Sequence, residues 1–241
     1  EIINKKNNNR GFLSLQNLKW TIPKKKSIQN IHKIGDILFV KKENNFWVLK
    51  QYPKVNGGIV IFPTDTVYAL GCLSNQKERL KDIARIKGKK LEHAPLSFLF
   101  SDIRSLSSFV SPMDSKTFRF IKSMLPGPYA FIMEAAKKLP TPFQKRKTVG
   151  VRIPNHSILK SLLPILSSPI VSTSIHDPDK ILDYTTDPEI LFKKWNSEID
   201  LMLSDGYGKN NPSTVIDLTK SPYEIIRKGA GDIPKNLLIN L

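Results

Sequence analysis

The sequence is poor in cysteine and contains no long apolar run. Cys72 is the single cysteine among 241 residues, which excludes an internal disulfide and a cysteine-based zinc site. A single thiol also fits a reducing compartment. No run of about 18 apolar residues is present, which argues against a membrane-spanning helix, and no signal-peptide pattern is visible. We therefore predict a globular protein of the cytoplasmic type.

Acidic residues are scarce as well, because 21 Asp and Glu stand against 38 Lys and Arg, a net charge of +17. Such a field attracts polyanions such as RNA, nucleotides or anionic lipid. The alternative is a lysine-rich composition whose side chains are simply solvated. The excess is uneven, since residues 1–56 hold 12 basic against 3 acidic residues.

The composition changes near residue 56. Residues 1–10 are polar and of low complexity, and we predict that they are disordered. The apolar runs at 37–40 and 46–49 predict two strands of a small hairpin. Residues 11–56 therefore form a β segment that is separate from the remainder of the chain.

From residue 57 onward, strand patterns alternate with helix patterns, which predicts a layered α/β fold. Helices are expected after the capping residues Asp102 and Asp114, and one is expected to begin at Pro188. The other predicted helices cover 76–87 and 156–166. Strands are predicted at 57–62, 96–100, 129–133, 148–153, 169–173, 199–203, 213–218 and 224–228.

A group of motifs follows these predicted strands. PTDTVYALG at 63–71 places hydroxyls and a carboxylate after a buried strand, where open α/β sheets bind ligands. Alone it could equally be a strand-to-helix turn capped by Thr64 or Thr66. Further along come LPGPYAF (125–131), TVGVRIP (148–154), PIVSTS (169–174), NPSTVIDL (211–218) and IIRKGAGDI (225–233). This ordered set over residues 57–241 resembles the YrdC/YciO family, and within it the YciO branch.

The resemblance implies a twisted mixed α/β sheet with flanking helices and a concave, basic cavity. Members of the family condense L-threonine, bicarbonate and ATP into threonylcarbamoyl-adenylate, with magnesium, for the modification of tRNA in the cytoplasm. Members are also described as binding double-stranded RNA. The expected ligands are therefore ATP, magnesium, L-threonine, bicarbonate and RNA.

Three basic residues carry the catalytic part of the resemblance. Lys87 and Lys89 stand where the family has a Lys-x-Arg pair on the phosphates, and Arg152 matches an inward-pointing arginine. Adenylation places negative charge on phosphate oxygens, so fixed cations suit this chemistry and no side-chain nucleophile is needed. Arg152 can grip a phosphate or carboxylate with two parallel hydrogen bonds.

The substrate-binding part rests on hydroxyls and one further arginine. Thr64 matches the family threonine that helps to hold the L-threonine substrate. The remaining matches belong to the nucleotide site and the segment that closes it, and they are Ser172, Thr173, Ser174, Ser213 and Arg227.

Two positions depart from the family pattern. Lys89 replaces the forked guanidinium with a point charge, which is not a conservative change at a bidentate site. His176 stands where the synthase branch has asparagine, and it is either a pH-dependent acid–base group or an ordinary loop histidine. These departures leave three readings open: a threonylcarbamoyl-adenylate synthase, a non-catalytic RNA- or ribosome-binding module, and an inactive relic.

Other patterns carry less chemistry. Residues 11–56 are similar to part of the OB-like domain of class A penicillin-binding proteins, and are either a gene-fusion remnant or a basic RNA-binding appendage. Ser157 and Lys160 match S-x-x-K without its partner motifs, which predicts the start of an amphipathic helix. The cluster at 145–147 meets phosphate or is solvated. Asp177, Asp179 and Asp183 lack ordered ligand spacing, so no metal site is predicted.

Overall fold

The computed structural model describes residues 58–175 and 186–233 in full, together with the backbone course of five strands within residues 1–51. Three of these form one small sheet, β1 (Ile2–Ile3), β2 (Arg10–Ser14) and β3 (Lys19–Thr21). The antiparallel pair of β4 (Ile37–Lys42) and β5 (Phe46–Gln51) confirms the predicted hairpin. Residues 4–9, in the stretch predicted to be disordered, lie outside the described residues.

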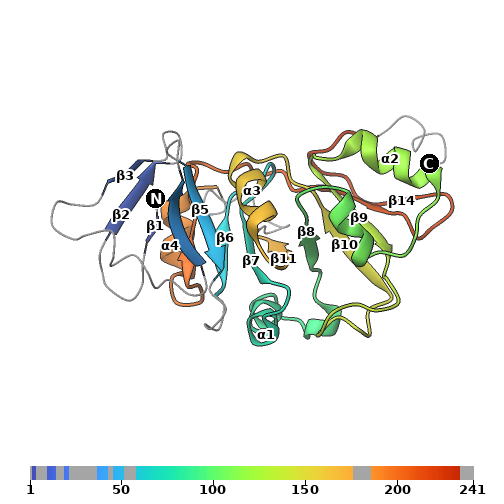
Figure 1. Cartoon of the computed structure of the whole chain (residues 1–241), viewed down its shortest axis with the longest axis horizontal. Helices are drawn as coiled ribbons and strands as arrows, with labels where there is room; N and C mark the ends of the chain where they lie inside the picture. The colour runs from blue at the N-terminus through green and yellow to red at the C-terminus, as the bar shows by residue number, and fades with distance from the viewer. Residues whose placement is uncertain are drawn as a thin grey trace.

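A twisted sheet of nine strands runs along the long axis of the molecule (Figure 1). Its order is β12-β6-β7-β11-β8-β10-β9-β13-β14. The pairs β12–β6, β8–β10 and β9–β13 are parallel and the others are antiparallel, so the sheet is mixed as predicted. The strands are β6 (Val60–Phe62), β7 (Ala69–Leu73), β8 (Ser97–Leu99), β9 (Tyr129–Glu134), β10 (Thr148–Arg152), β11 (Ile170–Ser174), β12 (Leu201–Met202), β13 (Thr214–Asp217) and β14 (Glu224–Arg227).

One strand was not predicted. The structure places β7 directly after the PTDT turn, antiparallel to β6, so this turn leads into a strand and not into a helix. All five residues of β7 are buried, although none is β-branched and the central one is a glycine, a composition with weak strand preference. A Cβ at Gly71 would lie 2.8 Å from the carbonyl oxygen of Val171, so the glycine permits β11 to approach.

Four α-helices are described, and two of them begin at side-chain caps. They are α1 (Lys77–Ile86), α2 (Ser115–Met124), α3 (Ser157–Leu162) and α4 (Pro188–Trp195). The carboxylate of Asp114 accepts the amide of Thr117 at 2.7 Å, and that of Asp187 accepts the amide of Glu189 at 2.8 Å. Asp102 accepts the amide of Ser105 at 2.9 Å, but a 3₁₀-helix over Arg104–Ser108 follows it and not the expected α-helix.

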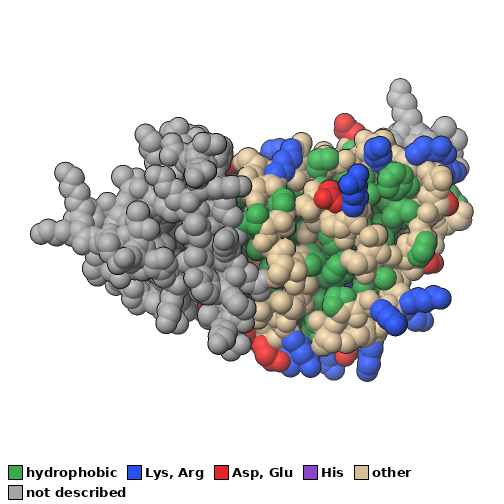
Figure 2. Space-filling view, viewed as in Figure 1, with side chains coloured by type: hydrophobic (Ala, Val, Ile, Leu, Met, Phe, Trp, Pro, Cys, Tyr) green, Lys and Arg blue, Asp and Glu red, His purple; other side chains and the backbone are tan. Residues whose placement is uncertain are grey.

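The core lies on both sides of the sheet. The larger cluster includes the fully buried rings of Tyr68, Phe98 and Phe131. A second cluster joins Leu159 and Leu162 of α3 to the strands that this helix covers in Figure 1. Figure 2 shows hydrophobic side chains in the middle of one described face, with Lys and Arg mostly around its rim. No helix among the described residues is long and apolar enough to cross a bilayer.

Candidate functional site

A cavity of about 450 Å³ opens between the strands that carry most of the predicted site residues. We call it the cationic cavity, because four basic side chains line it and its described lining contains no carboxylate. Besides Arg146, which is discussed below, it brings together seven of the ten predicted residues: Lys87, Arg152, Ser172, Thr173, Ser174, Ser213 and Arg227. Such a set attracts a polyphosphate and offers it both cations and hydroxyl donors.

Arg152, the last residue of β10, is the most buried of these cations, with 7% of its side chain exposed. Its Nη2 lies 3.0 Å from Oδ1 of Asp65 and donates to Oγ1 of Thr66 at 3.2 Å. Its Nε is buried and has no hydrogen-bond partner among the described residues. Burial lowers the pKa of Arg152, Asp65 opposes that change, and Arg227 adds to it. The ion pair with Asp65 therefore supports a charge that burial opposes.

A chain of three hydroxyls connects the PTDT turn to the segment before β13. Oγ1 of Thr66 lies 3.1 Å from Oγ1 of Thr64 and 3.3 Å from Oγ of Ser213. All three residues are buried. Thr64 also donates to the carbonyl of Val67 at 2.7 Å, so its hydroxyl is fixed by the turn itself. Thr64 thus reaches the cationic cavity through Thr66 and does not line that cavity directly.

Two further arginines are anchored on main-chain carbonyls. Arg227 donates from Nε and Nη2 to the carbonyl of Ser213, at 3.1 and 2.8 Å. Arg146 donates from Nη2 to the carbonyls of Leu91 and Ala94, at 2.7 and 3.1 Å. Burial lowers the pKa of both guanidinium groups. Since carbonyls hold them in place, their charge is not cancelled by a carboxylate.

Arg146 answers a question that the sequence left open. The basic cluster at 145–147 was predicted either to meet phosphate or to be solvated. The structure divides it, because Arg146 lines the cationic cavity whereas Lys145 and Lys147 are exposed. The alternation of side chains on an extended segment could have indicated such a split, but not which residue points inward.

The two lysines after α1 also separate. Nζ of Lys87 donates to the carbonyl of Ser174 at 3.3 Å, which places it beside the end of β11. Lys89 is exposed and does not line the cavity. The reason is local, because Gly88 takes a φ of 63° and the amide of Lys89 donates back to the carbonyl of Ala84. His176, the remaining candidate, lies outside the described residues.

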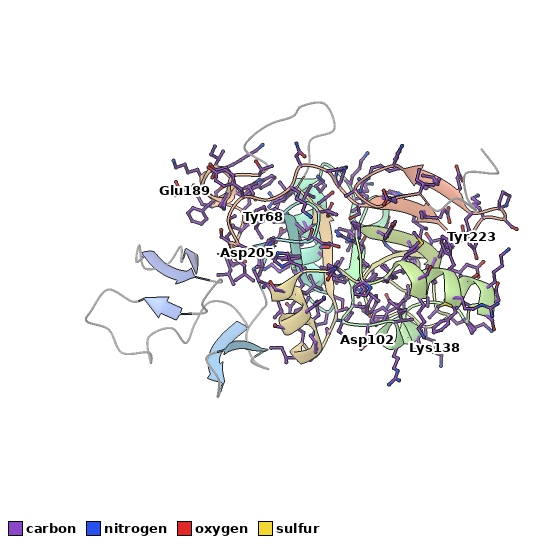
Figure 3. All side chains as sticks on the ribbon, turned by 90° about the horizontal axis from the view of Figure 1, so that it is seen from above. Tyr68, Asp102, Lys138, Glu189, Asp205 and Tyr223 are labelled. Carbon is purple, nitrogen blue, oxygen red and sulfur yellow. The ribbon has the colours of Figure 1, made fainter. Side chains whose placement is uncertain are left out.

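A second cavity of about 380 Å³, here called the side cavity, is lined in part by Asp65, the ion-pair partner of Arg152 in the cationic cavity. Thr64, Asp65, Tyr68, His156, Asp205 and Lys209 are among its lining residues. Nε2 of His156 lies 3.4 Å from Oδ2 of Asp205, and its buried Nδ1 has no partner among the described residues. Burial lowers the pKa of His156, while Asp205 and Asp65 oppose the change. Figure 3 labels Tyr68 and Asp205, which lie close together.

A larger and mostly apolar groove of about 990 Å³ lies between α2 and the turn after β8. Ile103, Val110, Met113 and Phe118 contribute to its surface, and no predicted site residue does. Volume alone would favour this groove. The chemistry favours the cationic cavity, which combines apolar walls with converging polar groups.

The described residues do not build a metal site. No group of three His, Cys, Asp or Glu among them is placed to hold a metal ion. The one carboxylate next to the cationic cavity, Asp65, is already engaged by Arg152 and by the amide of Asn155. The described residues therefore provide no cage of protein ligands for a metal ion, and magnesium, which usually keeps several waters and binds substrate phosphates, would enter with the nucleotide. Asp177, Asp179 and Asp183 lie outside the described residues.

Comparison with known proteins agrees with this geometry. Residues 55–229 match the family model Sua5/YciO/YrdC, described as telomere recombination. The uncharacterized protein YciO of Escherichia coli K12 is 36% identical over 180 residues, which cover 73% of this chain and 85% of that protein. An uncharacterized protein of Haemophilus influenzae is 36% identical over 177 residues, covering 73% of this chain and 84% of its own.

Solved structures share the fold as well. The crystal structure of E. coli YciO superimposes with a TM-score of 0.65 at 36% identity, over 73% of this chain and 85% of that one. The crystal structure of P. abyssi Sua5 complexed with L-threonine gives a TM-score of 0.63 at 26% identity, over 71% of this chain and 50% of that one. The family match over residues 55–229 covers the whole lining of the cationic cavity.

Proposed function

Because the chain belongs to the Sua5/YciO/YrdC family, we propose that its cationic cavity binds ATP and L-threonine and forms threonylcarbamoyl-adenylate. The observation that carries this proposal is the convergence of Lys87, Arg146, Arg152 and Arg227 on one cavity without a carboxylate in its described lining. The L-threonine complex of the structurally similar Sua5 supports the choice of amino acid.

The reaction begins when the amine of L-threonine combines with bicarbonate to give a carbamate and water. A carbamate oxygen then attacks the α-phosphorus of ATP, and the bond from that phosphorus to the bridging oxygen of pyrophosphate breaks. The products are threonylcarbamoyl-adenylate and pyrophosphate. Negative charge grows on the α-phosphate and on the leaving group, so fixed cations stabilise the transition state.

The residues divide between charge stabilisation and orientation. Arg152, Arg227 and Lys87 supply cations that the fold already holds in place, so little reorganisation is needed when the substrate binds. The hydroxyls of β11, from Ser172 to Ser174, offer hydrogen bonds to the nucleotide. Thr64, at the other end of the hydroxyl chain, is assigned to L-threonine. No step is assigned to magnesium, which would be held mainly by the phosphates of ATP and by water.

The test is pyrophosphate release from ATP with L-threonine, bicarbonate and magnesium. Release that depends on L-threonine and falls by at least about 100-fold in Arg152→Ala is the expected result. Arg152→Lys, which keeps the charge but not the forked geometry, should be intermediate. Circular dichroism shows whether each variant is folded. A folded wild-type chain that releases no pyrophosphate with L-threonine would overturn the proposal.

A second candidate is a non-catalytic RNA-binding module, favoured by the net charge of +17 and by the Lys and Arg side chains around the rim in Figure 2. Binding to a tRNA or a double-stranded RNA would then weaken steeply with salt, because each phosphate contact releases counterions. RNA affinity that survives Arg152→Ala would place the RNA on the outer surface and not in the cationic cavity. RNA binding without pyrophosphate release would favour this candidate over the synthase.

A further inference from the structure

We propose that Asp65 is a positioning residue that holds Nη2 of the Arg152 guanidinium and leaves the Nε–H donor free for an oxygen of the bound ligand. The identification of this ligand oxygen as one of a phosphate or a carboxylate rests on the proposed function. The pairing of Asp65 with Arg152, and its effect on the arginine, can be tested without that function.

The contacts define which donor atoms of the guanidinium are occupied. Asp65 and Arg152 are both deeply buried, with 8% and 7% of their side chains exposed. Nη2 of Arg152 donates to Oδ1 of Asp65 at 3.0 Å and to Oγ1 of Thr66 at 3.2 Å. Nε, on the same guanidinium, is buried without a partner among the described residues. A buried unsatisfied donor is costly, and in a residue that lines the cationic cavity it is the group that a ligand oxygen would satisfy.

Asp65 is itself fixed from two sides. Its Oδ2 accepts the amide of Asn155 at 3.1 Å, three residues after Arg152 in the chain. Its carbonyl accepts Nζ of Lys209 at 3.1 Å. The carboxylate therefore connects the turn between β6 and β7 with the segment after β10. These contacts favour the orientation in which the carboxylate of Asp65 faces Arg152.

We expect Asp65 to affect the orientation of the Arg152 guanidinium more than the stability of the protein. A buried ion pair contributes little net stability, but removal of one partner leaves a buried charge unpaired. Without the carboxylate, the guanidinium of Arg152 is free to adopt other rotamers, and its Nε–H no longer points in one direction. A ligand would then have to order that side chain on binding, which costs affinity.

The first readout is the Nε–H resonance of Arg152 in a ¹H–¹⁵N spectrum, assigned through its loss in Arg152→Lys. We expect a single resonance that exchanges slowly with solvent in the wild type, at least about 10-fold faster exchange in Asp65→Asn, and an intermediate rate in Asp65→Glu. Asp205→Asn is the matched control, because it removes a carboxylate of the side cavity that pairs with His156 and not with Arg152. An unchanged Arg152 resonance in both Asp65 variants would overturn the proposal.

The second readout is the dissociation constant for ATP, measured by calorimetry. We expect it to rise about 10-fold in Asp65→Asn and about 3-fold in Asp65→Glu, and to stay within about 2-fold in Asp205→Asn. If Asp65→Asn does not fold, Asp65→Glu carries the comparison. Addition of ATP or inorganic pyrophosphate should also shift the Arg152 resonance in the wild type.

The two proposals fail in different ways. Wild-type protein that binds neither ATP nor pyrophosphate would contradict the proposed function, and the exchange rate of the Arg152 resonance would still decide the role of Asp65. Wild-type protein that binds ATP, with Asp65 variants that bind it equally well, would keep the proposed function and remove Asp65 from it. A merely structural role would lower the melting temperature of Asp65→Glu without changing the Arg152 resonance at a temperature where the variant is folded.

Discussion

The ion pair between Arg152 and Asp65 connects the cationic cavity to the side cavity, yet the charges of the two linings differ. The cationic cavity has four basic side chains and no carboxylate in its described lining. The side cavity sets the carboxylates of Asp65 and Asp205 against Lys209 and His156. The positively charged side chains are therefore distributed unevenly between the two cavities. The position of a few carboxylates decides which cavity attracts an anion.

The polar groups of the two cavities also differ in what their hydrogen bonds do. In the side cavity the hydroxyl of Tyr68 donates to the carbonyl of Gly206 at 2.6 Å and accepts the amide of Asp205 at 3.3 Å, which fastens a loop onto the sheet. In the cationic cavity, main-chain carbonyls hold Arg146 and Arg227 without neutralising them. We therefore expect substitutions in the cationic cavity to affect ligand binding and substitutions in the side cavity to affect the stability of the fold.

Arg152→Ala should produce the largest effect, because Arg152 lines the cationic cavity and pairs with Asp65 of the side cavity. Its loss leaves Asp65 buried and unpaired, and we expect the free energy of unfolding to fall by about 3–5 kcal/mol. Urea denaturation followed by circular dichroism measures this change. The double variant Arg152→Ala/Asp65→Ala should recover part of the loss. Equal stability of Arg152→Ala and wild type would contradict the buried ion pair.

Arg227→Ala should separate binding from stability within the cationic cavity. Arg227 is only partly buried and bonds to a carbonyl, so its loss leaves no buried charge. We expect the ATP dissociation constant to rise about 10-fold, while the free energy of unfolding changes by less than about 1 kcal/mol. Arg119→Ala, at an exposed arginine of α2 outside the lining, is the matched control. Equal ATP affinity in both variants would remove Arg227 from the site.

A comparison of Lys87→Ala with Lys89→Ala tests whether a lysine must line the cationic cavity to contribute to ATP binding. Only Lys87 lines the cationic cavity, so we expect the ATP dissociation constant to rise about 5-fold for Lys87→Ala and less than about 2-fold for Lys89→Ala. Titration at two salt concentrations should show that both effects weaken with salt. A larger effect at Lys89 would mean that its side chain turns inward when the ligand binds.

His156→Gln should have the smallest effect, and on stability alone. Burial lowers the pKa of His156, against the opposing influence of Asp205 and Asp65. As the pH falls below the ordinary histidine pKa of about 6.5, the unfolded chain takes up a proton before the folded one does, so stability decreases. The glutamine variant lacks this loss, so the two stability curves should diverge between pH 7 and about pH 5. A change of ATP affinity at pH 8 greater than about 2-fold would contradict the separation of the two cavities.

Local signals in the sequence were sufficient for much of the fold. Asp114 and Pro188 predicted helix starts because a cap depends on residues within one turn. The strand β7 was missed because Ala69–Leu73 has no β-branched residue, and its burial depends on β6 and β11, which approach it from distant parts of the chain. Asp102 was followed by a 3₁₀-helix because four of the five residues of that segment are serine or arginine, which provide little apolar surface for a longer helix.

Some features of the candidate site could likewise be predicted from the sequence, and others could not. The resemblance supplied the positions of Arg152, Arg227 and the hydroxyls of β11, and the structure brings them into one cavity. The role of Asp65 could not be read from the sequence, because its partner Arg152 lies 87 positions away and no spacing rule connects them. The inward turn of Arg146 and the outward turn of Lys89 likewise depend on backbone conformation.

The strand order of the sheet determines how late in the synthesis of the chain the cationic cavity can be completed. Lys87 follows α1, whereas Arg227 lies on β14, the last of the described strands and an edge of the sheet. Chains are synthesised from the N-terminus, and domains fold as units. A growing chain that ends before residue 213 has neither Ser213 nor Arg227, so it lacks the hydroxyl beside Thr66 and one of the four cations. Nucleotide binding would thus report on the completion of the domain by the ribosome, as well as on its folding.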